Sequence, residues 1–259
     1  RAVKDGLPAN RILSAFGIVN GTCNYILTQM TDEGRDFGEV LKEAQAHGYA
    51  EADPTLDIEG LDSAHKLQIL ATLAFRTAVN LKDIYTEGIT GVTQQDVVNA
   101  AELGYRIKLL AIAKAFEGAL EVRVHPTMIP AASPLAAVSG VFNAVFLTGD
   151  NVGNLMFYGR GAGQLPTASA VWSDVLEIAR RVAHGIPALD TDFPSVGANP
   201  LPLRPVEDIR TAYYLRVMAM DRPGVLAQVA GILRRHDISL VSVLTTERAP
   251  DWMAARTSS

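Results

Sequence analysis

The side chains best suited to chemistry lie between Ala44 and Lys66, where five carboxylates precede one lysine. These carboxylates belong to Glu51, Asp53, Asp57, Glu59 and Asp62. Asp62 and Lys66 are four residues apart, so on a helix they share one face with the acid N-terminal to the base. An amine held beside a carboxylate in this way is suited to proton transfer.

Lys66 is expected to be buried, because residues 67–75 are apolar on most faces of a helix. A buried lysine needs a carboxylate partner or gives up its proton, and either state favours proton transfer. The alternative is a surface ion pair between Lys66 and Asp62, which would contribute only a few tenths of a kcal/mol.

The acids are expected on a loop that leads into a helix over residues 61–75. Pro54 keeps Asp53 out of the helical region, and Gly60 precedes the new periodic segment. Asp62 then falls in the first turn of the helix, where the helix dipole favours a negative charge.

A second candidate site follows the apolar segment 11–19, which is typical of a buried strand. Asn20, Gly21 and Thr22 turn this strand into a helix that continues to about residue 30. Backbone N–H groups at such a helix start bind anionic ligand groups, but Asn20 is equally well explained as a simple N-cap.

A glycine-rich turn over residues 158–167 ends a strand and opens a helix over residues 167–184. Its glycines follow a Gly-x-Gly-x-Gly pattern, and no acidic residue ends a strand about 20 residues later, so it is not a dinucleotide fingerprint. Taken alone, it favours a tight turn over a phosphate site.

The remaining pattern predicts helices and antiparallel strands in one α+β domain, a mixed β-sheet with covering helices. The expected helices cover residues 1–7, 37–47, 93–105 and 133–139, and the expected strands cover residues 84–89, 108–116, 120–129, 142–148 and 155–158. Residues 108–129 form a hairpin in this scheme, and Thr93 with Asp96 form the N-terminal cap of a helix.

The C-terminal part is expected to be a separate small domain. Five prolines between residues 187 and 205 indicate a linker, which we place at residues 187–210. Beyond it, a strand over 213–220, a helix over 225–236 and a strand over 238–246 form the start of a βαβ unit, whereas residues 248–259 show no pattern.

Composition excludes several classes of protein. The chain has 259 residues, 48% hydrophobic and 20% charged, with a net charge of −5, and it has no basic cluster of the kind nucleic acid requires. No apolar run approaches the roughly 18 residues of a membrane helix. Its one cysteine, Cys23, excludes disulfide scaffolds and cysteine-rich metal sites and favours a cytoplasmic location.

A metal site in the acidic loop is also disfavoured, because the acids lack an EF-hand spacing and His47 and His65 show no ligand pattern. We therefore expect no metal. The chain begins at Arg1 without a start methionine, inside an expected helix, which favours a piece of a longer protein.

Three segments in order resemble the homoserine dehydrogenase family. They are residues 17–27, residues 44–66 with Gly48, Asp53-Pro54, Gly60 and Lys66, and residues 159–170 with the glycine-rich turn. The resemblance implies reduction of aspartate 4-semialdehyde to homoserine with NADPH or NADH, on the route to threonine, methionine and isoleucine. It spans most of residues 1–186, which we assign as the catalytic and dimerisation domain.

The resemblance also implies roles for individual residues. Lys66 would act in proton transfer, held by Asp62, while Glu51 and Asp57 would bind the substrate amine and ordered water. The pocket would further be lined by Thr22, Gly21 and Tyr49, and the cofactor would contact Gly161, Ala162 and Gly163. The carboxylates suit the α-ammonium group of this substrate, and its aldehyde oxygen needs a proton donor.

The region from residue 211 to 259 resembles a truncated ferredoxin-like ACT regulatory domain, for which the family suggests threonine as the effector. The family's nucleotide-binding half would precede Arg1, so this chain alone is expected to be inactive. A homo-oligomer is expected, with the hairpin over residues 108–129 as one contact surface. A non-catalytic amino-acid-binding regulatory module is the alternative, but it would have no need of the lysine among acids.

Overall fold

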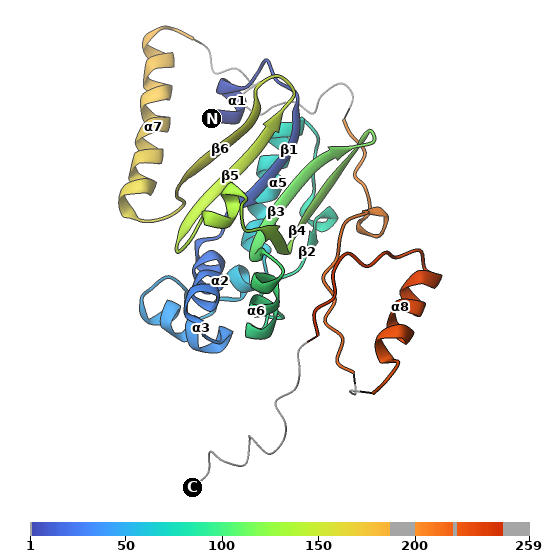
Figure 1. Cartoon of the computed structure of the whole chain (residues 1–259). Coiled ribbons are helices and arrows are strands. Elements are labelled where there is room, and N and C mark those ends of the chain that lie inside the picture. Colours follow the sequence, from blue (N-terminus) through green and yellow to red (C-terminus); the bar gives the residue numbers. More distant parts are fainter. Residues whose placement is uncertain (1, 187–199, 220–221, 246–259) are drawn as a thin grey trace. The chain divides into compact units, whose positions relative to one another are not determined.

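The computed structural model describes residues 2–186, 200–219 and 222–245. The chain divides into two compact units, Arg1–Tyr213 and Tyr214–Ser259, shown in Figure 1. The residues of both candidate sites lie in the first unit. None of the helices in the described ranges is long and apolar enough to cross a membrane.

The first unit is built on one six-stranded sheet with the strand order β2-β4-β3-β1-β5-β6. The strands are β1 (Ile12–Ile18), β2 (Tyr85–Thr86), β3 (Tyr105–Phe116), β4 (Ala119–Pro130), β5 (Phe142–Gly149) and β6 (Gly153–Arg160). All neighbours are antiparallel except β2 and β4, which are parallel. The expected α+β class with a mixed sheet is therefore confirmed.

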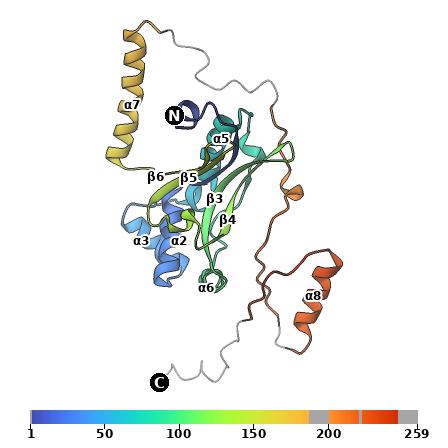
Figure 2. The same ribbon diagram turned by 45° about the horizontal axis from the view of Figure 1, so that its top comes forward.

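Helices cover one face of this sheet (Figure 1 and Figure 2). The first unit contains α1 (Ala2–Gly6), α2 (Gly21–Glu33), α3 (Phe37–Ala46), α4 (Thr55–Ile58), α5 (Leu61–Phe75), α6 (Gln94–Glu102), α7 (Gln164–Ala183) and the 3-10 turns η1 (Leu81–Asp83), η2 (Pro134–Ala137) and η3 (Val206–Asp208). Helices α2, α5 and α6 pack on β3, and their apolar faces form the main core. The predicted capping box of α6 is confirmed, with Thr93 and Asp96 each accepting from the other's backbone N–H.

The opposite face of the sheet is only partly covered. Side chains alternate between the faces of a strand, so Ile18, Leu110 and Ile112 point away from the main core and form a second, smaller cluster with the η2 turn. Phe16 and Phe146 in this cluster remain partly exposed.

In the C-terminal unit the predicted helix is present, but the two predicted strands are not found in the described residues. The helix is present as α8 (Val225–Arg235), close to its expected bounds. The described residues 213–219 and 238–245 form no strand, so the two strand predictions are wrong within these ranges. A strand needs a hydrogen-bonded neighbour, and neither segment has one there. Residues 246–259 lie outside the described residues.

Part of the predicted linker is packed on the first unit. Residues 187–199 lie outside the described residues, whereas residues 200–209, which we call the strap, run along the edge of β4. Leu120 N–H donates to Pro202 O at 2.8 Å and Arg204 N–H donates to Leu120 O at 2.9 Å. Ile209 at the end of the strap is buried. This stretch is therefore attached to the sheet.

Candidate active site

Asn20 is the centre of the acidic cluster. Its Nδ2 group donates to Asp57 Oδ1 at 2.6 Å and to Asp62 Oδ2 at 2.9 Å. Its Oδ1 atom accepts from the backbone N–H of Cys23 at 2.8 Å and so caps α2. The N-cap interpretation is confirmed, and the second amide function joins β1 to the acids, which the sequence analysis missed.

Lys66 is hydrogen-bonded but exposed, so the prediction of a buried lysine was wrong. Its Nζ donates to Asp62 Oδ2 at 2.7 Å and to Val19 O at 2.9 Å, while 47% of its side chain is accessible. Helix α5 buries a single face, made of Ser63, Ala64, Leu67 and Ala71. The apolar residue Ile69, on the same side as Lys66, is exposed too.

Asp57 lies on the short helix α4, where a loop was expected, whereas Asp62 lies in the first turn of α5 as predicted. Gly60 has φ +81° and starts α5, a conformation that glycine adopts without strain. Helix α4 is packed on residues 86–90, where Ile89 N–H donates to Ile58 O at 2.7 Å. A Cβ atom at Gly88 would lie 2.1 Å from Ile58 O, so only glycine permits this close approach.

Cys23 lies beneath the acids and is not a reactive thiol. It is fully buried, and its Sγ donates to Asp57 O at 3.1 Å. Burial, reinforced by the charges of Asp57 and Asp62, raises the pKa of the thiol far above its usual range. It therefore stays protonated and holds α4 against α2.

Thr22 and Tyr49 meet on the neighbouring side of α2. The Thr22 hydroxyl donates to Tyr49 O at 2.7 Å, and the Tyr49 ring packs against Tyr25 with centroids 5.0 Å apart. The Tyr25 hydroxyl in turn donates to Glu43 Oε1, a bond that raises the pKa of Tyr25. The exposed Tyr49 ring is thus held by a buried neighbour.

Glu51 lies outside the hydrogen-bonded cluster. Its side chain is exposed, and it is the backbone carbonyl of Glu51 that accepts from Gln45 Nε2, at 3.1 Å. Its role in binding a substrate stays a prediction.

The glycine-rich turn approaches the start of α2 through Asn143 on β5. A Cβ atom at Gly161 would lie 2.0 Å from Asn143 Nδ2, and one at Gly21 would lie 3.7 Å from Asn143 Oδ1. The Asn143 Oδ1 atom is buried and has no hydrogen-bond partner among the described residues. Ala162 is exposed, and Gly163, with φ +113°, starts α7. The structure thus brings together two predicted sites 140 residues apart, and Asn143 carried no sequence signal for this.

Comparison with known proteins decides the family. The family model described as homoserine dehydrogenase matches residues 1–176, and the ACT domain model matches residues 213–254. The chain belongs to the homoserine dehydrogenase family. It is 48% identical over 248 residues to homoserine dehydrogenase of Neisseria gonorrhoeae and 48% identical over 251 residues to that of Pseudomonas aeruginosa.

Among solved structures, the chain is similar to homoserine dehydrogenase of Thiobacillus denitrificans, with a TM-score of 0.88 and 49% identity over 94% of this chain. A hyperthermophilic archaeal homoserine dehydrogenase in complex with NADPH has a TM-score of 0.59 and 27% identity, over 70% of this chain and 51% of its own. The matches to the Neisseria, Pseudomonas and Thiobacillus proteins cover 94%, 95% and 94% of this chain, respectively. The chain spans only 57% of the length of each of these proteins.

Proposed function

We propose that this homoserine dehydrogenase chain carries the substrate-binding and proton-transfer half of an enzyme that reduces aspartate 4-semialdehyde to homoserine. The observation that carries the proposal is the hydrogen-bonded row of Asp57, Asn20, Asp62 and Lys66. It presents an ammonium donor next to carboxylates, which is what an amino-aldehyde substrate needs. An amino-acid sensor would have no use for such a row.

The carboxylates would bind the α-ammonium group of the substrate. Asp57 Oδ1 accepts from Asn20, and its Oδ2, which has no hydrogen-bond donor in the described ranges, would accept from the ligand. The exposed Glu51 and the ring of Tyr49 would complete this end of the pocket, with Thr22 and Gly21 fixing its floor at the start of α2. Charge-assisted hydrogen bonds of this kind are about twice as strong as neutral ones.

Lys66 would supply the proton. A dinucleotide, when bound, would supply a hydride to the aldehyde carbon, which leaves negative charge on the carbonyl oxygen. The Lys66 ammonium donates a proton to that oxygen, giving the alcohol, and is reprotonated from water because it is exposed. Asp62 and Val19 O hold the ammonium in position through hydrogen bonds of 2.7 and 2.9 Å.

The cofactor would be NADP or NAD, contacting this chain at Gly161, Ala162 and Gly163. The turn fits a close ligand approach, because these residues are exposed and carry almost no side-chain bulk. A nucleotide-binding half would precede Arg1, and α7, whose apolar side chains Leu165, Trp172 and Val182 are exposed, would pack against it.

Kinetics of the full-length protein test the proposal. Lys66→Ala should lower kcat for semialdehyde reduction about 100-fold or more. Lys114→Ala, a partly exposed lysine at the far end of β3, should leave it unchanged. An undiminished rate in Lys66→Ala would remove the assignment.

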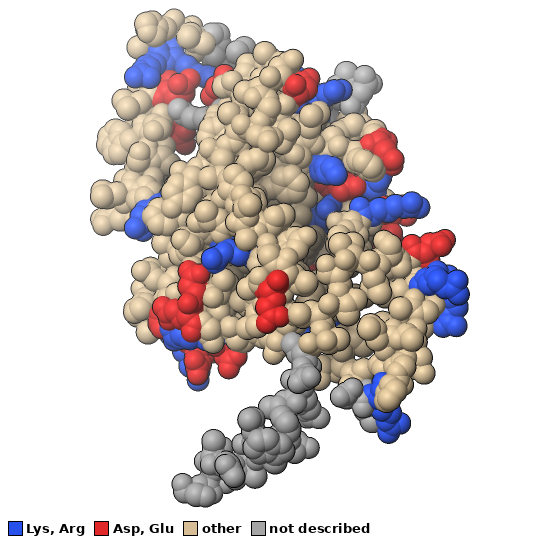
Figure 3. All heavy atoms as spheres, in the orientation of Figure 1, with Lys and Arg blue, Asp and Glu red and all other residues tan. Residues whose placement is uncertain are grey.

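We further propose that the open sheet face binds a second copy of the chain. Ile112, Phe16, Phe146 and Met156 are register partners across four strands and form one apolar row. Figure 3 shows few charged atoms over this part of the sheet. Phe146→Lys should give a monomer in sedimentation velocity, whereas Phe157→Lys, on the other face of β6, should keep the parent mass. A parent that sediments as a monomer would contradict this.

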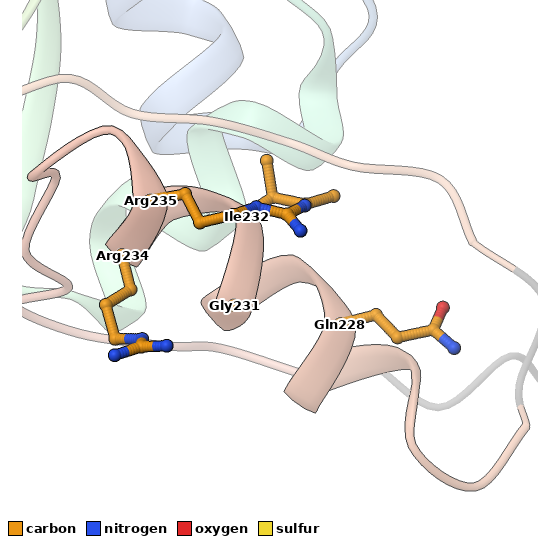
Figure 4. A pocket seen from close by; sticks show the side chains of 5 residues that line it. All are labelled: Gln228, Gly231, Ile232, Arg234 and Arg235. Atoms are coloured by element: carbon orange, nitrogen blue, oxygen red, sulfur yellow. The ribbon is translucent and has the colours of Figure 1, made fainter.

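The C-terminal unit would bind an amino acid, with threonine as the family-based candidate, and act as a regulatory module in the cytoplasm. Figure 4 shows Gln228, Ile232 and Arg235 projecting from α8, where a hollow of about 430 Å³ is also lined by Gly231 and Arg234. Isothermal titration with threonine, and with valine as control, tests the effector. Equal heats for the two amino acids would reject threonine.

A further inference from the structure

A buried lysine outside the acidic cluster has no carboxylate partner among the residues that the structure describes. Lys108 on β3 is 3% exposed, and its Nζ donates to Asn24 Oδ1 at 3.0 Å and to Val138 O at 2.6 Å. The nearest charges that influence it are those of Arg106 on its own strand and Asp32 on α2. Burying an ammonium group without a carboxylate partner costs folding free energy, so we expect Lys108 to have a function through its contacts.

Asn24 on α2, which accepts from Lys108, also donates hydrogen bonds to the loop before β5. Its Nδ2 donates to Val138 O at 3.3 Å, and to Gly140 O and Phe142 O at 3.0 Å each. Thr28, one turn later, accepts from the Gly140 N–H at 3.1 Å. The side chains of Asn24 and Thr28 therefore join the segment 138–142 to the first two turns of α2.

The segment 138–142 leads directly into Asn143 on β5. Asn143 is the residue directly after it, and its carboxamide fills the space between Gly21 at the start of α2 and Gly161 in the glycine-rich turn. Asn143 therefore lies against both glycines, and at Gly161 only the absence of a side chain allows this approach. Under the proposed function, one glycine belongs to the substrate side and the other to the cofactor side.

We propose that Lys108 and Asn24 are positioning residues that set the distance between the substrate and the cofactor by clamping the segment 138–142 and, through it, Asn143. This inference rests on the proposed function. Hydride transfer requires the two reacting carbons about 3–3.5 Å apart, and misplacement by about 1 Å lowers the rate by roughly 100-fold. A clamp far from the reacting atoms therefore has a large effect on kcat.

Two variants separate positioning from folding. Lys108→Met keeps the volume of the side chain and removes the buried charge, so the fold is expected to tolerate it. Asn24→Asp is isosteric and gives Lys108 a carboxylate, but it removes the donors to the three loop carbonyls. Lys114→Met on the same face of β3 is the matched control.

The measurements use the full-length protein. We expect kcat to fall about 10-fold or more and the dinucleotide KM to rise in both variants. The semialdehyde KM should stay within about 2-fold of the parent value, because the contacts of Asp57 and Asp62 are unchanged. Hydrogen exchange at the Gly140 amide should speed up in both variants and not in Lys114→Met.

Lys66→Ala in the same series separates the two failures. If the parent is active, Lys66→Ala is impaired, and Lys108→Met and Asn24→Asp match Lys114→Met in kcat, only the clamp is wrong. If Lys66→Ala retains the parent rate, the proposed function itself fails. Equal increases in both KM values with unchanged kcat would also overturn the clamp.

Discussion

Lys66 and Asn20 donate hydrogen bonds to the same oxygen atom, Oδ2 of Asp62, at 2.7 and 2.9 Å. The two donors come from α5 and from the end of β1, so the carboxylate joins the helix to the sheet. A third contact, from Lys66 to Val19 O at 2.9 Å, closes this ring. The ammonium group is therefore oriented by groups that belong to rigid elements.

Asn20→Ser separates the two functions of Asn20. Serine also caps a helix, so α2 should lose only a few tenths of a kcal/mol. The amide that joins Asp57 to Asp62 is lost, and the two carboxylates then repel each other. We expect kcat for semialdehyde reduction to fall about 10-fold or more, measured beside urea unfolding. A drop in stability that accounts for the whole loss would contradict the bridging role.

Gly88→Ala should displace the turn that carries Asp57. Because the added Cβ would lie 2.1 Å from Ile58 O and 2.4 Å from the Cα of Glu59, backbone must move. We expect a loss of about 2 kcal/mol in the free energy of unfolding and a higher semialdehyde KM. Gly91→Ala, where nothing lies within 4 Å, is the control and should match the parent. Identical unfolding curves for the two variants would refute the close contact.

Lys108→Met should change how stability depends on pH. Burial, then the charge of Arg106, lowers the pKa of Lys108 from 10.5 to about 8. Between these values the unfolded chain holds a proton that the folded chain has released, so the stability of the parent rises with pH in this window. The difference in unfolding free energy between Lys108→Met and the parent at pH 7 should shift in favour of the parent by up to about 3 kcal/mol by pH 10.5. A difference that does not change with pH would show that Lys108 is not perturbed.

Arg204→Ala should release the strap. Arg204 ion-pairs with Glu117 at 2.8 Å and with the buried Glu121 at 3.6 Å, and it stacks 4.9 Å above the Phe116 ring. We expect faster proteolysis within residues 200–209 and a loss of about 1–2 kcal/mol in unfolding free energy. Glu117→Gln should have a smaller effect, because that carboxylate is 68% exposed. Unchanged cleavage in Arg204→Ala would show that the backbone bonds alone hold the strap.

The strands and helices that form the site follow from hydrophobic periodicity, which is a local property. Helix α5, its first-turn acid Asp62 and the i, i+4 pair with Lys66 are visible in this way. The exposure of Lys66 cannot be predicted in this way, because the sequence of an apolar helix does not show which neighbours cover each of its faces. A resemblance to a family supplied roles for these residues, and the structure supplied their geometry.

Other features arise only from contacts distant in sequence. Asn143 meets Gly21 and Gly161 because β5 lies between β1 and β6, which no local pattern encodes. The strap contains Pro202 and Pro205 and so reads as a linker. Proline lacks an N–H but keeps its carbonyl, and at a sheet edge Pro202 O accepts from Leu120.

The accessibility of Lys66 also separates two requirements of catalysis. Under the proposed function, residues of this chain alone orient the proton donor, because Asp62 and Val19 O hold the Lys66 ammonium. They do not provide a low local dielectric, since nearly half of the side chain faces water. Under the proposed function, the bound substrate and dinucleotide would exclude this water, so Lys66 would be fully effective as a proton donor only when both ligands are in place.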